Sequence, residues 1–188
     1  MIALLGTGCV IPFVTPPLRA EVGATTQAGG QDSAPPSIHV AAGAHLASAL
    51  RRRDQPFDLG IGWVFEGNNQ SSGNGGYVEA AYFVDRGVRT RTAAGVRSEI
   101  LWTSMGRVVA NKLRIDHELF TTGRGEFKTK ERCGGATGLY SGATAIGVFV
   151  EAGHAWRPGD GFAFVATAGV SLRLPGTVGV MVGIPFCN

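Results

Sequence analysis

The stretch Phe57-Asp-Leu-Gly-Ile-Gly-Trp-Val-Phe-Glu66 alternates almost perfectly between large apolar side chains and a second set of Asp, Gly, Val and Glu. Alternation with a period of two is typical of a β-strand, because successive side chains point to opposite faces of a sheet. One face of this segment carries Phe, Leu, Ile and Trp, whereas the other carries mainly glycine and acidic residues. The segment therefore predicts a strand whose two faces meet different environments.

The same alternation recurs along the chain and predicts a series of strands. The runs cover residues 18–28, 37–50, 57–66, 77–86, 90–104, 109–120, 143–156, 162–174 and 178–186. Turn-forming pairs such as Arg86-Gly87, Met105-Gly106 and Pro175-Gly176 separate neighbouring runs, so we expect consecutive strands to form hairpins. No segment has a helical period. The sequence predicts an all-β fold, an antiparallel up-and-down β-barrel with little or no helix.

The composition departs from that of an ordinary soluble protein. Asp, Glu, Lys and Arg make up only 16% of the 188 residues, against about 25% in typical usage. The formal net charge is +3, and the one dense basic run, Arg51-Arg52-Arg53, is followed at once by Asp54, so we expect no nucleic-acid partner. No apolar run approaches the roughly 20 residues that a spanning helix needs. Strands would have to carry this chain into a membrane.

The chemistry of the two faces favours a membrane barrel over a soluble one. A face in water should be rich in sizeable polar residues, yet many positions opposite the apolar face are Gly or Ala, which suit a cramped interior. Charges of both signs occupy mid-strand positions on this same face, and buried charges require partners. We therefore predict an interior ion-pair network of Arg91, Arg97, Glu99, Lys112, Arg114, Asp116, Glu118 and Glu151, together with Arg19, Glu21, Asp58 and Glu79.

Aromatic residues at strand ends support the same interpretation. They are Trp63, Phe65, Trp102, Trp156, Phe162 and Phe186. If hairpins run up and down, these ends share one rim, as an interfacial aromatic girdle requires. The apolar faces extend over about the 9–11 residues that a tilted membrane strand needs.

Residues 18–186 resemble, in pattern, the small bacterial outer-membrane barrels of the outer-membrane protein A and X types. Val178-Gly-Val-Met-Val-Gly-Ile-Pro-Phe186 is similar to the closing strand of that class, which commonly ends on an aromatic residue, although here Cys187 and Asn188 follow. The resemblance implies a location in the bacterial outer membrane, contact with membrane lipid and a structural or surface-interaction role with a surface or envelope protein as partner. An eight-stranded barrel is just filled by its side chains, so we expect no wide pore.

The strand number must be reconciled with that class, because its single-chain barrels have an even number of strands. The pattern yields nine candidate strands. Eight remain if the run 18–28 lies outside the barrel, and ten result if residues 121–142 hide another strand. We favour eight and keep ten as the alternative.

In this interpretation the chain consists of an N-terminal leader, residues 1–17, and a single β-barrel domain, residues 18–188. Met1-Ile-Ala-Leu-Leu-Gly-Thr-Gly-Cys9 is signal-like, with small residues before a cysteine, so Cys9 is a candidate for lipidation. Cys133 and Cys187 then remain as the candidate disulfide in an oxidising envelope compartment.

Residues 121–142 are predicted to form a long charged loop, which is the best candidate for a binding element. Its basic residues are Arg124, Lys128, Lys130 and Arg132. Two alternatives to the membrane barrel stay open. One is a soluble or lipid-anchored, lipocalin-like barrel that binds an apolar ligand inside. The other is a membrane-embedded lipid hydrolase that assembles Ser98, His117 and a carboxylate on the outer wall.

No catalytic motif of a known enzyme class occurs in the sequence, so we expect no enzymatic activity and no cofactor. The four histidines, His39, His45, His117 and His154, are spread over separate segments, and the cysteines lack metal-ligand spacing. The sequence therefore predicts no metal site.

Overall fold

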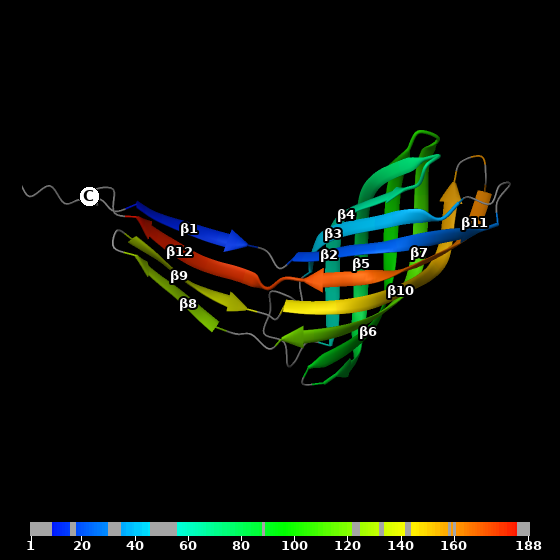
Figure 1. Cartoon of the computed structure of the whole chain (residues 1–188). Coiled ribbons are helices and arrows are strands. Elements are labelled where there is room, and N and C mark those ends of the chain that lie inside the picture. The colour runs from blue at the N-terminus through cyan, green and yellow to red at the C-terminus, as the bar shows by residue number, and fades with distance from the viewer. Residues whose placement is uncertain are drawn as a thin grey trace, which may run out of the picture.

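The computed structural model describes residues 9–15, 18–29, 35–45, 56–87, 89–121, 125–131, 134–141, 144–157, 159 and 161–183. All regular secondary structure within these ranges is β-strand (Figure 1). They contain no helix that is long and apolar enough to cross a membrane. The all-β prediction is confirmed.

Eight antiparallel strands close into a barrel in the order β10-β11-β2-β3-β4-β5-β6-β7, in which β7 also pairs with β10. Strands that pair in the barrel also follow one another in the chain, apart from the β8–β9 segment between β7 and β10. The exception is the pairing of β11 with β2, which joins the last barrel strand to the first. The strands are β2 (Leu18–Ala28), β3 (Ser37–His45), β4 (Phe57–Gly67), β5 (Ser72–Arg86), β6 (Thr90–Thr103), β7 (Gly106–Thr121), β10 (Thr144–Arg157) and β11 (Gly161–Arg173). The predicted number of eight is confirmed, and the alternative of ten is not.

A separate four-stranded sheet, which we call the extension sheet, has the order β1-β12-β9-β8. Its members are β1 (Cys9–Thr15), β8 (Gly125–Glu131), β9 (Gly134–Ser141) and β12 (Gly176–Gly183). In the chain, each of these four strands lies within a few residues of a barrel strand: β1 next to β2, β8 next to β7, β9 next to β10 and β12 next to β11. Those four barrel strands are adjacent to one another in the barrel wall. The extension sheet therefore prolongs one side of that wall (Figure 1).

The extension sheet corrects three details of the sequence interpretation. Residues 18–28 are a barrel strand, so the run outside the barrel is the last one, not the first. For the same reason the run 178–186 does not close the barrel, since β12 pairs with β1 and β9. Residues 121–142 do not form one long loop, because β8 and β9 pair as a hairpin. Short polar and glycine-rich strands carry a weaker periodic signal than the barrel strands, which is why the pattern missed this hairpin.

The predicted two-faced character of the strands is realised throughout the barrel. In β10, for example, buried and exposed residues alternate from Thr144 to Ala152, with the apolar residues Ile146, Val148 and Val150 outside. Glycine on the inner face makes room for flat aromatic rings. A Cβ at Gly62 would lie 2.6 Å from the Tyr77 ring, and one at Gly169 would lie 2.8 Å from the Phe149 ring. The cramped interior expected from the sequence is present.

The barrel has two unlike ends. At the distal end lie the connections β4–β5, β6–β7 and β10–β11, each only a few residues long. At the proximal end β2 begins and β11 ends, and the extension sheet continues from there. Five of the six predicted girdle residues, Trp63, Phe65, Trp102, Trp156 and Phe162, belong to strand ends at the distal side. Phe186 lies outside the described residues.

Candidate functional site: the charged interior of the barrel

The inner face of the barrel brings together acidic and basic side chains, histidines included, from all eight of its strands. All twelve residues predicted for the interior network lie there, and each makes at least one ion pair. Arg97 and Glu99, which are neighbours on one face of β6, are both 0% exposed. The alternation of each strand aims these groups inward, and barrel closure removes them from water. We divide them into three clusters along the barrel axis.

The central cluster consists of three arginines and three carboxylates. Its members are Arg19, Glu21, Glu79, Arg97, Arg114 and Asp116. The Glu21 carboxylate accepts from Arg97 Nη1 at 2.8 Å and from Arg114 Nη2 at 2.9 Å. Arg19 donates to Glu79 at 3.0 Å and also contacts Asp116. Each arginine therefore bridges carboxylates from different strands, which crosslinks the wall through its centre.

Aromatic rings complete the central cluster. The guanidinium of Arg97 lies 4.0 Å from the centroid of the Tyr77 ring, and that of Arg114 lies 4.2 Å from the Phe149 ring. Guanidinium groups stack favourably on ring faces when they are out of water. These layers of glycine, aromatic ring and arginine fill the middle of the barrel.

The proximal cluster contains Asp58, Arg91, Glu118 and Arg173. Arg91 Nε donates to Glu118 at 3.1 Å, and Arg173 donates to Glu118 and to Asp58, each at 3.0 Å. His45 Nδ1 lies 3.2 Å from the same Asp58 carboxylate, and its Nε2 lies 3.3 Å from the Tyr77 hydroxyl. Two carboxylates and two arginines balance one another here.

The distal cluster contains His39, Glu66, Glu99, Lys112 and Glu151. Lys112 Nζ lies 2.6 Å from Glu99, 3.3 Å from Glu66 and 3.5 Å from Glu151. Glu151 additionally accepts from Arg97 of the central cluster at 2.8 Å. His39 Nδ1 lies 3.3 Å from Glu66. Within this cluster one lysine serves three carboxylates.

Two small cavities among the described residues lie beside the clusters. A cavity of about 50 Å³ opens at the distal end and is lined by Gln27, Ser37, Glu66, Asn68, Lys112 and Arg157 among others. A cavity of about 10 Å³, close to the size of one water molecule, lies beside Arg91 and Arg173 at the proximal end. The central cluster lies between them, and neither cavity could hold an organic ligand of ordinary size.

Comparison of the chain with models of known protein families, with curated proteins and with solved structures finds no match. The resemblance to outer-membrane barrels therefore rests on architecture alone, which is a closed antiparallel barrel of eight strands.

The outer wall of the barrel is apolar. Large hydrophobic side chains stand exposed all around it, including Ile61 at 65%, Leu113 at 69% and Val148 at 57%. Among the described barrel strands, exposed Asp, Glu, Lys and Arg residues occur only near strand ends, at Asp85, Arg86 and Arg107. Polarity is thus inverted relative to a soluble barrel, with charge inside and hydrocarbon outside.

Two polar pairs interrupt the outer wall, and they bear on the hydrolase alternative. Ser98 donates to Asn111 at 2.7 Å, and Thr92 lies 3.0 Å from His117 Nδ1. Ser98 is the register partner of Asn111, six residues from His117, which places the two about 20 Å apart along the strands. The structure therefore does not assemble the predicted pair of Ser98 and His117.

Several predicted sites cannot be placed. Arg124, Arg132, Cys133 and Cys187 lie outside the described residues. Lys128 and Lys130 belong to β8, and Cys9 begins β1, but only their backbone is described. The proposed lipidation, disulfide and basic binding element stay predictions.

The predicted network omitted four interior groups, which are His39, His45, Glu66 and Arg173. The alternation already assigned them to the same face as the network residues, so the signal was present in the sequence. The sequence pattern did not indicate which carboxylate pairs with which cation, because partners such as Arg19 and Asp116 are 97 residues apart in the chain.

Proposed function

We propose that this protein is a small outer-membrane β-barrel with a structural or surface-interaction role and without a wide pore. The single observation that carries the proposal is the inverted polarity of the barrel. A wall bearing exposed Ile, Leu, Val and Trp on every strand would be costly in water, and soluble monomers rarely expose apolar patches larger than a few hundred Å². In a bilayer the same wall is favourable.

The backbone also meets the requirement of a lipid environment. Hydrocarbon offers no hydrogen-bond partners, so a spanning sheet must be closed. Barrel closure through β11 and β2 leaves the eight strands without an unpaired edge. On the outer wall, polar side chains have hydrogen-bond partners: Ser98 is bonded to Asn111, and Thr92 to His117.

The interior supports a role other than a wide pore or an apolar carrier. A lipocalin-like carrier needs an apolar cavity, whereas here arginines and carboxylates fill the centre and the cavities hold only water-sized contents. The same filling argues against free passage of solutes.

The extension sheet is the element best suited to meet a partner. It is open, with β1 and β8 as its edge strands, and an open edge can pair with a strand of another protein. The partner in this proposal is an envelope protein that adds a strand to one of these edges.

Membrane extraction tests the proposal. Cells expressing the full chain are fractionated, and the membranes are washed with alkaline carbonate. We expect the protein to stay in the pellet until detergent is added, and to migrate differently on gels before and after boiling. Release into the carbonate wash would overturn the membrane assignment. A control for the pore claim is conductance of the purified protein in planar bilayers, where steady large currents would contradict a filled interior.

A further inference from the structure

The formal charges of the buried interior do not balance. The described barrel encloses eight carboxylates, from Glu21, Asp58, Glu66, Glu79, Glu99, Asp116, Glu118 and Glu151. It encloses seven cations, from Arg19, Arg91, Arg97, Lys112, Arg114, Arg173 and the half-buried Arg157, which lines the distal cavity together with Glu66. With neutral histidines the interior has one more negative charge than positive ones, and buried charge without a partner is strongly unfavourable.

The excess is confined to the distal cluster. The central cluster has three carboxylates and three arginines, and the proximal cluster has two of each. The distal cluster has Glu66, Glu99 and Glu151 around Lys112, and Glu151 also pairs with Arg97 and Arg114 of the central cluster. Arg157 lines the mouth of the distal cavity, but among the described contacts it makes no ion pair with these carboxylates.

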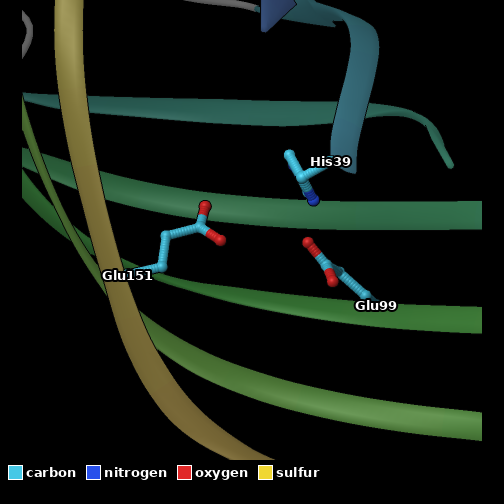
Figure 2. A group of neighbouring side chains, drawn as sticks. All are labelled: His39, Glu99 and Glu151. Atoms are coloured by element: carbon cyan, nitrogen blue, oxygen red, sulfur yellow. The ribbon is translucent and has the colours of Figure 1, made fainter. Parts of the chain in front are cut away.

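Buried atoms of this cluster also lack hydrogen-bond partners. They include His39 Nε2, Glu99 Oε1 and Glu151 Oε2, all on residues that are at most 3% exposed. Among the described residues, each of these atoms has only a longer ion-pair contact, to Glu21 at 4.0 Å, Arg97 at 3.8 Å and Lys112 at 3.5 Å respectively. Buried polar atoms are nearly always satisfied in folded proteins, so such a group calls for a missing partner such as water or an ion. Figure 2 shows the three side chains converging from β3, β6 and β10. One ligand atom from each lies within 4.8 Å of the others.

We propose that His39, Glu99 and Glu151 bind one divalent transition-metal ion, with Zn²⁺ as its simplest representative. One imidazole nitrogen and two carboxylate oxygens are a donor set that Zn²⁺ accepts, with a water molecule in the remaining position. A divalent ion supplies positive charge at the end of the barrel where the carboxylates outnumber the cations. Ligands at about 2.0–2.1 Å from the metal require the side chains to close in by roughly an ångström, which rotation of glutamate allows.

His39 is already oriented for this role. Its Nδ1 lies 3.3 Å from Glu66 Oε1, and donation of the Nδ1 proton to that carboxylate leaves Nε2, which has no hydrogen-bond partner among the described residues, as the ring nitrogen available to a metal. A carboxylate behind a ligating histidine is the usual arrangement in metal sites, because it fixes the tautomer and the ring. Glu66 also lines the distal cavity, so ions can reach the site from that end of the barrel.

Lys112 competes with the metal for the same oxygens. Its Nζ lies 2.6 Å from Glu99 and 3.5 Å from Glu151, so metal binding must displace it toward Glu66. Removal of this charge by Lys112→Met should therefore strengthen binding, by about tenfold or more. If Lys112 only stabilised the fold, its replacement would not strengthen metal binding.

The test uses the full chain refolded in detergent, with Cys9, Cys133 and Cys187 alkylated so that thiols cannot bind metal. Zn²⁺ alone is titrated by calorimetry, and bound metal is counted after dialysis. We expect one Zn²⁺ per chain, loss of binding in Glu99→Gln and His39→Asn, and a 10- to 100-fold weaker affinity in Glu66→Gln. Co²⁺ substitution in the unmutated protein should give nitrogen and oxygen coordination by X-ray absorption, a readout that needs no variant to fold.

His154→Asn provides the matched control, because His154 lies on the same strand as Glu151 but is exposed on the outer wall. It should leave Zn²⁺ affinity unchanged. Stoichiometric binding that disappears in His154→Asn and persists in His39→Asn would place the metal elsewhere and overturn the proposal. If neither the unmutated protein nor Lys112→Met binds Zn²⁺, the proposal is also overturned. Protonation of a buried carboxylate would then account for the excess negative charge.

Discussion

The barrel and the extension sheet are built from strands that follow one another in the chain, yet they solve the problem of strand edges differently. β2, β7, β10 and β11 lie in a closed wall, whereas β1, β8, β9 and β12 form an open sheet that ends at β1 and β8. The barrel strands enclose opposite charges that join one wall to another. Closure of the barrel thus brings charged side chains from strands far apart in the chain into contact.

The largest expected effect comes from removing one cation of the central cluster. Arg97→Met would leave Glu21 and Glu151, which Arg97 contacts at 2.8 Å each, with fewer partners in a buried site. Removal of one side of a buried ion pair costs about 3–5 kcal/mol. Urea unfolding in detergent measures the free energy of unfolding. The control is Lys130→Met on β8, an edge strand outside the barrel, for which we expect a change within about 0.5 kcal/mol. Equal losses in both variants would show that the network does not distinguish the two regions.

A charge on the outer wall should have the next largest effect. Val148 is 57% exposed at the middle of β10. In a bilayer Val148→Arg should cost about 2–4 kcal/mol and reduce insertion, because arginine would face hydrocarbon. Val148→Leu, which keeps the wall apolar, should be neutral. Insertion into lipid vesicles and gel mobility before and after heating provide the measurement. Normal insertion of Val148→Arg would contradict the lipid-facing assignment of this wall.

The inner face next to Val148 should reject bulk for a different reason. A Cβ at Gly147 would lie 2.8 Å from Ser171 Oγ and 2.9 Å from the His117 carbonyl oxygen. Gly147→Lys therefore overfills the interior, and we expect a loss of about 1–3 kcal/mol in urea unfolding. A silent Gly147→Lys would reverse inside and outside for β10.

The smallest effect on the barrel is expected from a disulfide beyond the extension sheet. Gly134, next to Cys133, is the register partner of Gly183, four residues before Cys187, so the described neighbours of both thiols meet at one end of the sheet. Mass spectrometry of the non-reduced protein should identify a peptide linking Cys133 and Cys187. Reduction should change barrel stability by no more than about 0.5 kcal/mol. Free thiols at both positions, or a link from either one to Cys9, would remove this pairing.

The sequence predicted the barrel well because its signal is local. Alternation in segments such as 57–66 and 143–156 identified strands, faces and interior charges, since each depends only on neighbouring residues. The partners of Arg19, and the meeting of His39 with Glu99 and Glu151, depend on strand order and register around a closed wall. Those are properties of the assembled sheet, and no periodicity in one segment contains them.

The strand pair that closes the barrel has a kinetic consequence. β2 and β11 are joined by nearly the whole chain, and their pairing from Ala28–Phe164 to Arg19–Arg173 continues in β1 and β12 as far as Cys9–Gly183. Contacts across such a long loop form slowly, because the entropy of bringing the chain ends together is lost before the contacts are made. The β1–β12 pair lengthens this seam by seven further register pairs, from Thr15–Thr177 to Cys9–Gly183. We expect this seam to be the last part of the sheet to form.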